Sequence, residues 1–168
     1  MAIDDLKNAF DYIKEFYKEI AQMLTDLNDL MAKQDWVPMG SSITDELSYS
    51  LDRPEKWFVR HVFENYVNEK INDHIKGILI FFAREDFPPG VVFGSTKVSP
   101  KYEYKKWALW NIWADNKEKL RELNGKQMTL ETECSDGTIS GEVISIPLEE
   151  IKSHADLEAK VYQKLLEI

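Results

Sequence analysis

The sequence contains few cysteine, proline and glycine residues. Among 168 residues there is one cysteine, Cys134, so an intrachain disulfide cannot form. Seven glycines and six prolines are too few for a collagen-like or low-complexity chain. A chain without internal disulfides is typical of a reducing compartment, which predicts a cytoplasmic protein. Hydrophobic residues make up 43% of the chain, which is enough for one domain over residues 1–168.

Long apolar runs and catalytic signatures are also absent. No stretch approaches the roughly 20 apolar residues that cross a bilayer, and the acidic start is unlike a secretory leader, so we expect no membrane partner. The sequence contains no glycine-rich phosphate loop and no nucleophile elbow. Its three histidines, His61, His74 and His154, are far apart and have no neighbour at metal-ligand spacing. We therefore predict no metal and no cofactor.

Acidic residues outnumber basic ones by 30 to 21, which gives a formal net charge of -9. Nucleic-acid phosphates repel such a chain unless it carries a local basic stripe. One segment does mix bases with aromatic rings, a combination that suits single-stranded nucleic acid. Its candidate residues are Lys97, Lys101, Tyr102, Tyr104, Lys105, Lys106 and Trp107. The overall charge favours the other interpretation, a solvated loop whose rings tuck onto the core, so nucleic acid is not the partner that we expect.

The strongest pattern in the sequence is an apolar seam near the N-terminus. Its steps alternate between three and four residues, as in a heptad repeat, and no glycine or proline interrupts it. The seam consists of Ile3, Leu6, Phe10, Ile13, Tyr17, Ile20, Leu24, Leu27 and Met31. It predicts a long amphipathic helix over residues 1–33, roughly 45 Å in length at 1.5 Å per residue.

A helix of that length spans a whole domain of this size, whose radius of gyration is near 15 Å. Either the seam lies along the domain's own sheet, or part of it overhangs and pairs with a partner, most simply a second copy. The interface candidates are Ile13, Tyr17, Ile20 and, in a tryptophan-rich segment, Trp110. The second interpretation predicts a homodimer or a complex with another protein.

Residues 56–146 have the pattern of mainly antiparallel strands. Alternating and continuous apolar runs predict strands over 56–67, 77–83 and 91–98, and a polar turn over 68–76. The odd-numbered residues of the first strand form its more apolar set. We therefore expect that set to face the long helix.

The tryptophan-rich segment over 106–114 is ambiguous. On a helix its apolar side chains scatter around the circumference, so we favour a buried strand and keep a helix as the alternative. The remaining predicted elements are short helices at 43–50 and near 115–124, strands at 126–133 and 138–146 around the Ser135–Gly137 turn, and a helix over 154–167 capped by Ser153 or Asp156. This order predicts an α+β fold, with an antiparallel sheet of five to six strands packed against a long N-terminal helix and a C-terminal helix.

Charged residues near strand ends offer one place for chemistry. Arg60 and Glu64 lie on the first predicted strand, and Arg84 and Asp86 lie in the turn after the second. Carboxylates can transfer protons and arginines can bind anions, which would suit a small hydrolase; ordinary ion pairing around a sheet is the other interpretation. The surplus of apolar aromatic residues predicts instead a non-enzymatic binding or assembly protein that acts through protein–protein contacts.

Overall fold

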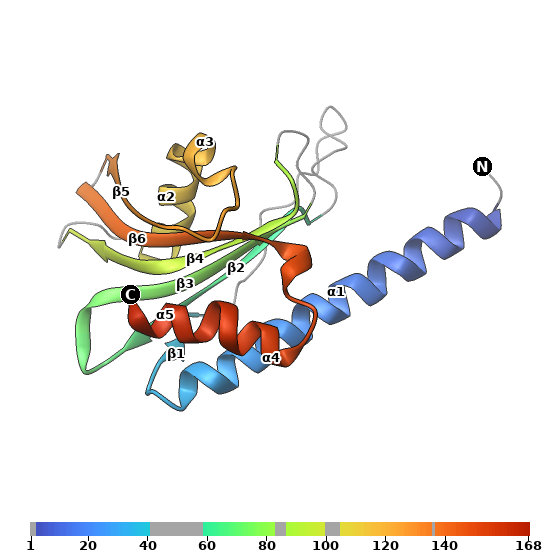
Figure 1. Cartoon of the computed structure of the whole chain (residues 1–168), viewed down its shortest axis with the longest axis horizontal. Helices are drawn as coiled ribbons and strands as arrows, with labels where there is room; N and C mark the ends of the chain where they lie inside the picture. Colours follow the sequence, from blue (N-terminus) through green and yellow to red (C-terminus); the bar gives the residue numbers. More distant parts are fainter. Residues whose placement is uncertain (1–2, 41–58, 83–86, 100–104, 136) are drawn as a thin grey trace.

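The computed structural model describes residues 3–40, 59–82, 87–99, 105–135 and 137–168. These residues form three layers, a central antiparallel sheet with helices on both faces (Figure 1). The predicted α+β fold class is therefore confirmed. The short helix that the sequence predicts over 43–50 lies outside the described residues.

Separate groups of helices cover the two faces of the sheet. One face carries the long helix α1 and, beside it, a C-terminal helix in three parts; the other carries a short helical segment that crosses the sheet (Figure 1). The first group consists of α1 (Ile3–Ala32), α4 (His154–Leu157), the π-helical turn η4 (Glu158–Tyr162) and α5 (Gln163–Glu167). The second consists of η2 (Lys105–Trp107), α2 (Ala108–Asp115) and α3 (Lys117–Leu120). Each face has its own apolar core.

Six strands make the sheet, and every neighbouring pair is antiparallel. They are β1 (Val37–Pro38), β2 (His61–Asn68), β3 (Ile71–Phe81), β4 (Gly90–Val98), β5 (Gln127–Cys134) and β6 (Gly137–Pro147). Their order across the sheet is β1-β2-β3-β4-β6-β5. The predicted hairpin at the Ser135–Gly137 turn is confirmed as β5 and β6. A 3-10 turn, η3 (Leu148–Glu150), leads from β6 to α4, where Ser153 Oγ accepts a hydrogen bond from the Asp156 backbone N–H at 3.1 Å.

The two halves of helix α1 lie in different surroundings. Its C-terminal half packs on the sheet and buries Ile20, Leu24 and Leu27. Its N-terminal half projects beyond the sheet, and residues 5–12 are all exposed (Figure 1). We call the sheet with the helices packed on it the body, and residues 5–15 the projecting half.

The preference for a strand over residues 106–114 is wrong, because the segment forms η2 and α2. Four side chains of α2 are buried against the sheet, and their spacing is that of one helical face. They are Ala108, Leu109, Ile112 and Trp113. The other tryptophans lie at the sides of this face and pack on β2, where Trp110 stacks on His61 and Trp107 contacts Phe63 with ring centroids 4.3 and 5.0 Å apart. Because this segment buries apolar side chains beyond the face that lies on the sheet, they spread around most of the helix circumference. The sequence therefore lacks the one-sided pattern of an amphipathic helix.

The faces of β2 are the reverse of the prediction. Val62 and Tyr66 belong to the core under α1, whereas Phe63 belongs to the core under α2. Helices cover both faces of this strand, and each set of alternating residues combines apolar with polar side chains. Apolarity alone therefore could not assign them.

The predicted polar turn over 68–76 is also wrong in extent. The chain turns at residues 69–70, and β3 already begins at Ile71. Near the start of β3, His74 pairs with Lys97 of β4, and both residues are exposed. Polar residues are compatible with a strand where its side chains reach solvent.

Candidate functional site

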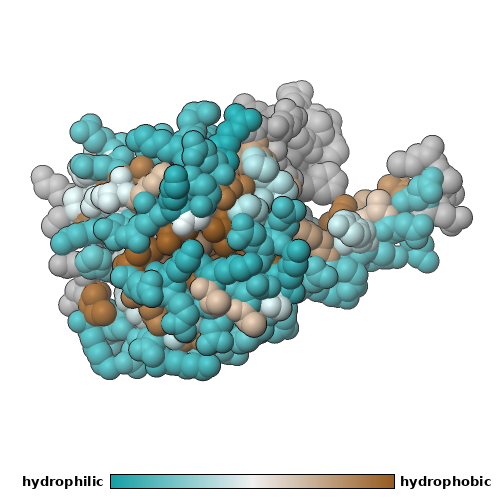
Figure 2. All heavy atoms as spheres, in the orientation of Figure 1, coloured by the Kyte–Doolittle hydropathy of each residue, from teal (hydrophilic) through white to brown (hydrophobic). Residues whose placement is uncertain are grey.

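The projecting half of α1 carries large apolar side chains into solvent. Leu6 and Phe10 of the seam are 42% and 49% exposed, and the neighbouring Tyr12 is 75% exposed. Figure 2 shows apolar residues along one side of this projection and hydrophilic residues along the other. The same seam is buried further along the helix, so its exposed part continues an apolar face that the body leaves uncovered.

An apolar recess of about 360 Å³ lies where α1 leaves the body. Phe16 and Tyr17 of α1 meet Phe82 there, with ring centroids 5.1 and 5.6 Å apart. The Tyr17 hydroxyl donates a hydrogen bond to the Val59 carbonyl oxygen at 2.8 Å, which fixes the point of departure of the helix. The recess is lined by Tyr12, Ile13, Phe16, Tyr17, Val59, Phe82, Pro89 and Leu148.

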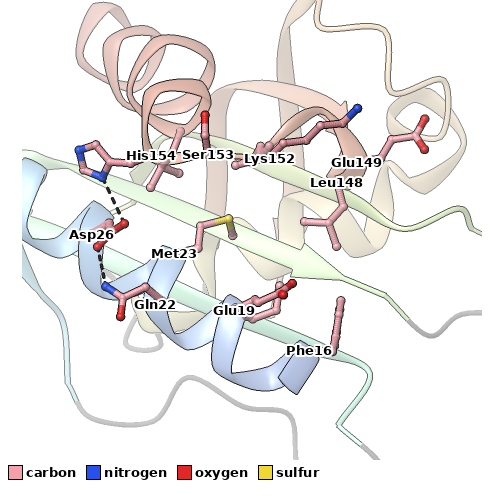
Figure 3. Close-up of a pocket in the computed structure, with 13 residues that line it drawn as sticks. Phe16, Glu19, Gln22, Met23, Asp26, Leu148, Glu149, Lys152, Ser153 and His154 are labelled. Atoms are coloured by element: carbon pink, nitrogen blue, oxygen red, sulfur yellow. Dashed lines mark hydrogen bonds and ion pairs between the residues drawn. The ribbon is translucent and has the colours of Figure 1, made fainter. Parts of the chain in front are cut away.

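A larger groove of about 620 Å³ continues from the recess, between α1 and the η3–α4 segment (Figure 3). The recess and the groove share Phe16 and Leu148. The floor of the groove is apolar, while charged and polar groups line its rim, a common arrangement in protein-binding surfaces. The remaining lining residues are Glu19, Ile20, Gln22, Met23, Asp26, Glu149, Ile151, Lys152, Ser153, His154 and Leu157.

One polar cluster joins the two walls of this groove. Asp26 on α1 accepts a hydrogen bond from Gln22 at 2.7 Å, and its other oxygen lies 3.1 Å from His154 Nδ1 on α4 (Figure 3). The hydrogen bonds from Gln22 and His154 lower the pKa of Asp26. The Ser153 hydroxyl is engaged with Asp156 as the helix cap. This cluster therefore connects α4 to α1, and its role is structural.

The predicted interface residues fall in three different environments. Ile13 and Tyr17 line the recess. Ile20 is only 6% exposed and belongs to the core under α1. Trp110 is half-buried on the opposite face of the sheet, against His61. Leu6 and Phe10 lie in the predicted seam, but the sequence does not reveal where the body ends, so it does not distinguish them from the buried members of the seam.

The predicted carboxylate–arginine site is described only in part. Glu64 is 8% exposed and points toward α1, where the Asn28 side chain donates a hydrogen bond to its carboxylate. Burial raises the pKa of Glu64, and the hydrogen bond from Asn28 opposes that rise. Arg60 is half-buried just before β2. Neither is among the described residues that line the recess or the groove. Arg84 and Asp86 lie outside the described residues.

The predicted basic–aromatic segment is also described in part. Lys97 is exposed on β4, and Lys105 and Lys106 are exposed in η2. Trp107 is half-buried, because one side packs on Phe63 and the Lys106 ammonium lies 5.7 Å from its ring centroid. Its ring therefore packs against the apolar core under α2. Lys101, Tyr102 and Tyr104 lie outside the described residues.

The fold and this surface define a class, an α+β protein with one helix extended beyond its sheet and an apolar recess at the base of that helix. No family model, curated protein or solved structure matches the chain. Among the described residues, no group of three or more His, Cys, Asp or Glu side chains could hold a metal ion. None of the helices in the described part of the chain combines the length and apolarity that a membrane crossing needs.

Proposed function

We propose that this protein is a non-enzymatic assembly module, which self-associates into a homodimer through the projecting half of α1. The observation that carries the proposal is the exposure of Leu6 and Phe10 in a seam that is buried further along the same helix. Fully burying one such side chain stabilises an assembly by about 1.5–3 kcal/mol. A helix that projects with its apolar face uncovered gains this free energy only when a partner covers it.

A second copy is the partner that the chain itself supplies. A two-fold dimer uses the same patch on both subunits, so that patch must be self-complementary. The exposed seam provides apolar ridges, and the recess beside it provides an apolar hollow. The charges next to the seam are partly satisfied within the helix, because Lys14 pairs with Asp11 at 3.3 Å and Lys18 with Glu15 at 2.7 Å. Apolar burial, more than ionic attraction, therefore drives the proposed association.

The test is the molar mass in solution, measured by light scattering after size exclusion at several concentrations. We expect the wild-type mass to approach twice the 19.6 kDa of one chain as concentration rises. The double variant Leu6→Gln/Phe10→Gln should weaken association at least about 100-fold, since the dimer loses four large apolar side chains and each loss costs about 1 kcal/mol or more. Asn8→Gln, an exposed position outside the seam, is the matched control and should behave as wild type. A wild-type chain that stays monomeric at every concentration overturns the proposal.

A further inference from the structure

The recess has the chemistry to receive the projecting seam. Its wall from the body consists of Val59, Phe82, Pro89 and Leu148, and none of the described residues that line it is charged. An amphipathic helix laying its apolar face into a hollow is a recurrent mode of protein recognition. The exposed Leu6 and Phe10 form such a face in every copy of the chain.

The spacing of the seam residues indicates how the α1 helices of two copies can align. Leu6, Phe10, Ile13 and Tyr17 follow one another at steps of four, three and four residues. This series is the same when it is read backwards, so an antiparallel copy of the helix meets it layer for layer. Leu6 then lies opposite Tyr17, and Phe10 lies opposite Ile13. The two-fold axis of such a pair passes between residues 11 and 12.

Resting on the self-association proposed above, we infer that the two α1 helices pair antiparallel, so that Leu6 of each copy docks in the recess of the other. Leu6 lies 11 residues from Tyr17, which is roughly 16 Å along a helix. The tip of each projecting half therefore reaches the base of the other. The recess is the receptor for that tip.

The area of the exposed side chains also favours this arrangement. Aromatic side chains bury about 150–250 Å² each, so the exposed parts of Phe10 and Leu6 in the seam offer at most roughly 200 Å² together. A stable interface buries about 800 Å² on each partner. The seam alone is too small, and the recess must take part. A parallel pair leaves both recesses uncovered, because each tip then lies beside the other tip.

The first experiment places a charge in the recess. Pro89→Glu changes an exposed wall residue, and we expect it to raise the dimer dissociation constant at least tenfold in sedimentation equilibrium. Pro88→Glu is the matched control, because Pro88 is the exposed neighbour and does not line the recess. Its dissociation constant should remain within twofold of wild type. Circular dichroism spectra and melting curves of both variants verify that they fold.

The second experiment reads the direction of pairing from disulfide formation. Cys134→Ser removes the only cysteine of the chain, so single cysteines can be placed at position 6 (Leu6→Cys) or 17 (Tyr17→Cys). One of the two chains carries an affinity tag, and the chains are mixed under mild oxidation. We expect the mixed 6–17 pair to form, because a disulfide requires Cα atoms within about 7 Å. Leu6→Cys alone should not cross-link, since the two copies of position 6 lie roughly 16 Å apart.

The outcomes separate this inference from the proposed function. If Leu6→Cys cross-links with itself in a wild-type-like dimer, the helices are parallel and the inference fails while self-association stands. If Pro88→Glu and Pro89→Glu leave equally strong dimers, the recess is not the receptor, and again only the inference fails. A wild-type chain that is monomeric at all concentrations overturns both, and indicates that another molecule covers the seam.

Discussion

Glu64 is a buried carboxylate on the face of β2 that packs under α1. Only 8% of the residue is exposed, and its carboxylate is hydrogen-bonded by Asn28. Asn28 also accepts a hydrogen bond from the Tyr66 hydroxyl at 2.8 Å. Burial raises the pKa of Glu64 despite this hydrogen bond. Because the charged form is disfavoured in the folded protein, Glu64 links folding stability to pH.

The sign of this linkage predicts the behaviour of Glu64→Gln. The unfolded chain releases this proton near pH 4.5, whereas the folded chain holds it to a higher pH. The stability contributed by Glu64 is therefore present below pH 4.5 and is lost as pH rises through the folded-state pKa. We expect Glu64→Gln to raise the urea midpoint at pH 7.5 and to change it little at pH 4. The control Glu131→Gln, at an exposed position of β5, should show no such pH dependence. Equal effects of Glu64→Gln at both pH values would contradict the assignment.

At the scale of elements, one lysine holds the end of the C-terminal helix to the sheet. Lys76 is a buried residue of β3, and its ammonium donates hydrogen bonds to the carbonyl oxygens of Leu165, Leu166 and Ile168, the last at 2.8 Å. The last carbonyls of a helix lack partners within it and carry partial negative charge. Burial lowers the pKa of Lys76. Lys76 therefore acts as a C-terminal cap supplied by a neighbouring element.

Removing this cap should destabilise the fold without touching the proposed interface. Lys76→Met keeps the length of the side chain but leaves buried carbonyl oxygens without their donor, which costs about 1–3 kcal/mol. Chemical unfolding should record that loss, and amide exchange in α5 should accelerate more than exchange in α1. Lys97→Met, at an exposed position on the adjacent strand β4, is the matched control. Unchanged exchange in α5 would contradict a capping role.

Elements whose surroundings are simple were predictable from the sequence. The seam of α1 needs only one apolar face, and the β5–β6 hairpin needs only alternation and a turn. The strand prediction for the tryptophan segment was wrong because Trp107 of η2 and Trp110 of α2 pack against Phe63 and His61 of β2. These contacts join residues more than 40 positions apart in the chain. The candidate site was likewise predictable only in part. The sequence supplied the seam, but the exposure of Leu6 and Phe10 depends on where the sheet ends, which tertiary packing alone decides.

At the scale of the whole molecule, the projecting half of α1 is separable from the body. The helix is anchored from Phe16 onward by Phe82, by the Tyr17–Val59 hydrogen bond and by the buried Ile20. Residues 5–12 are all exposed and contribute little to the two apolar cores. Short helices without tertiary contacts are marginally stable in water. Folding and assembly should therefore depend on different parts of the same helix.

Deleting residues 1–12 tests this separation. We expect the shortened chain to fold, because residues 5–12 are all exposed and belong to neither apolar core, and to be monomeric at every concentration. Association stabilises the folded state by mass action, so the wild-type melting temperature should rise with protein concentration, whereas that of the shortened chain should stay constant. Scanning calorimetry at two concentrations measures both. A shortened chain whose melting temperature still rises with concentration would move the interface elsewhere, because no part of the exposed seam before Ile13 would remain to form it.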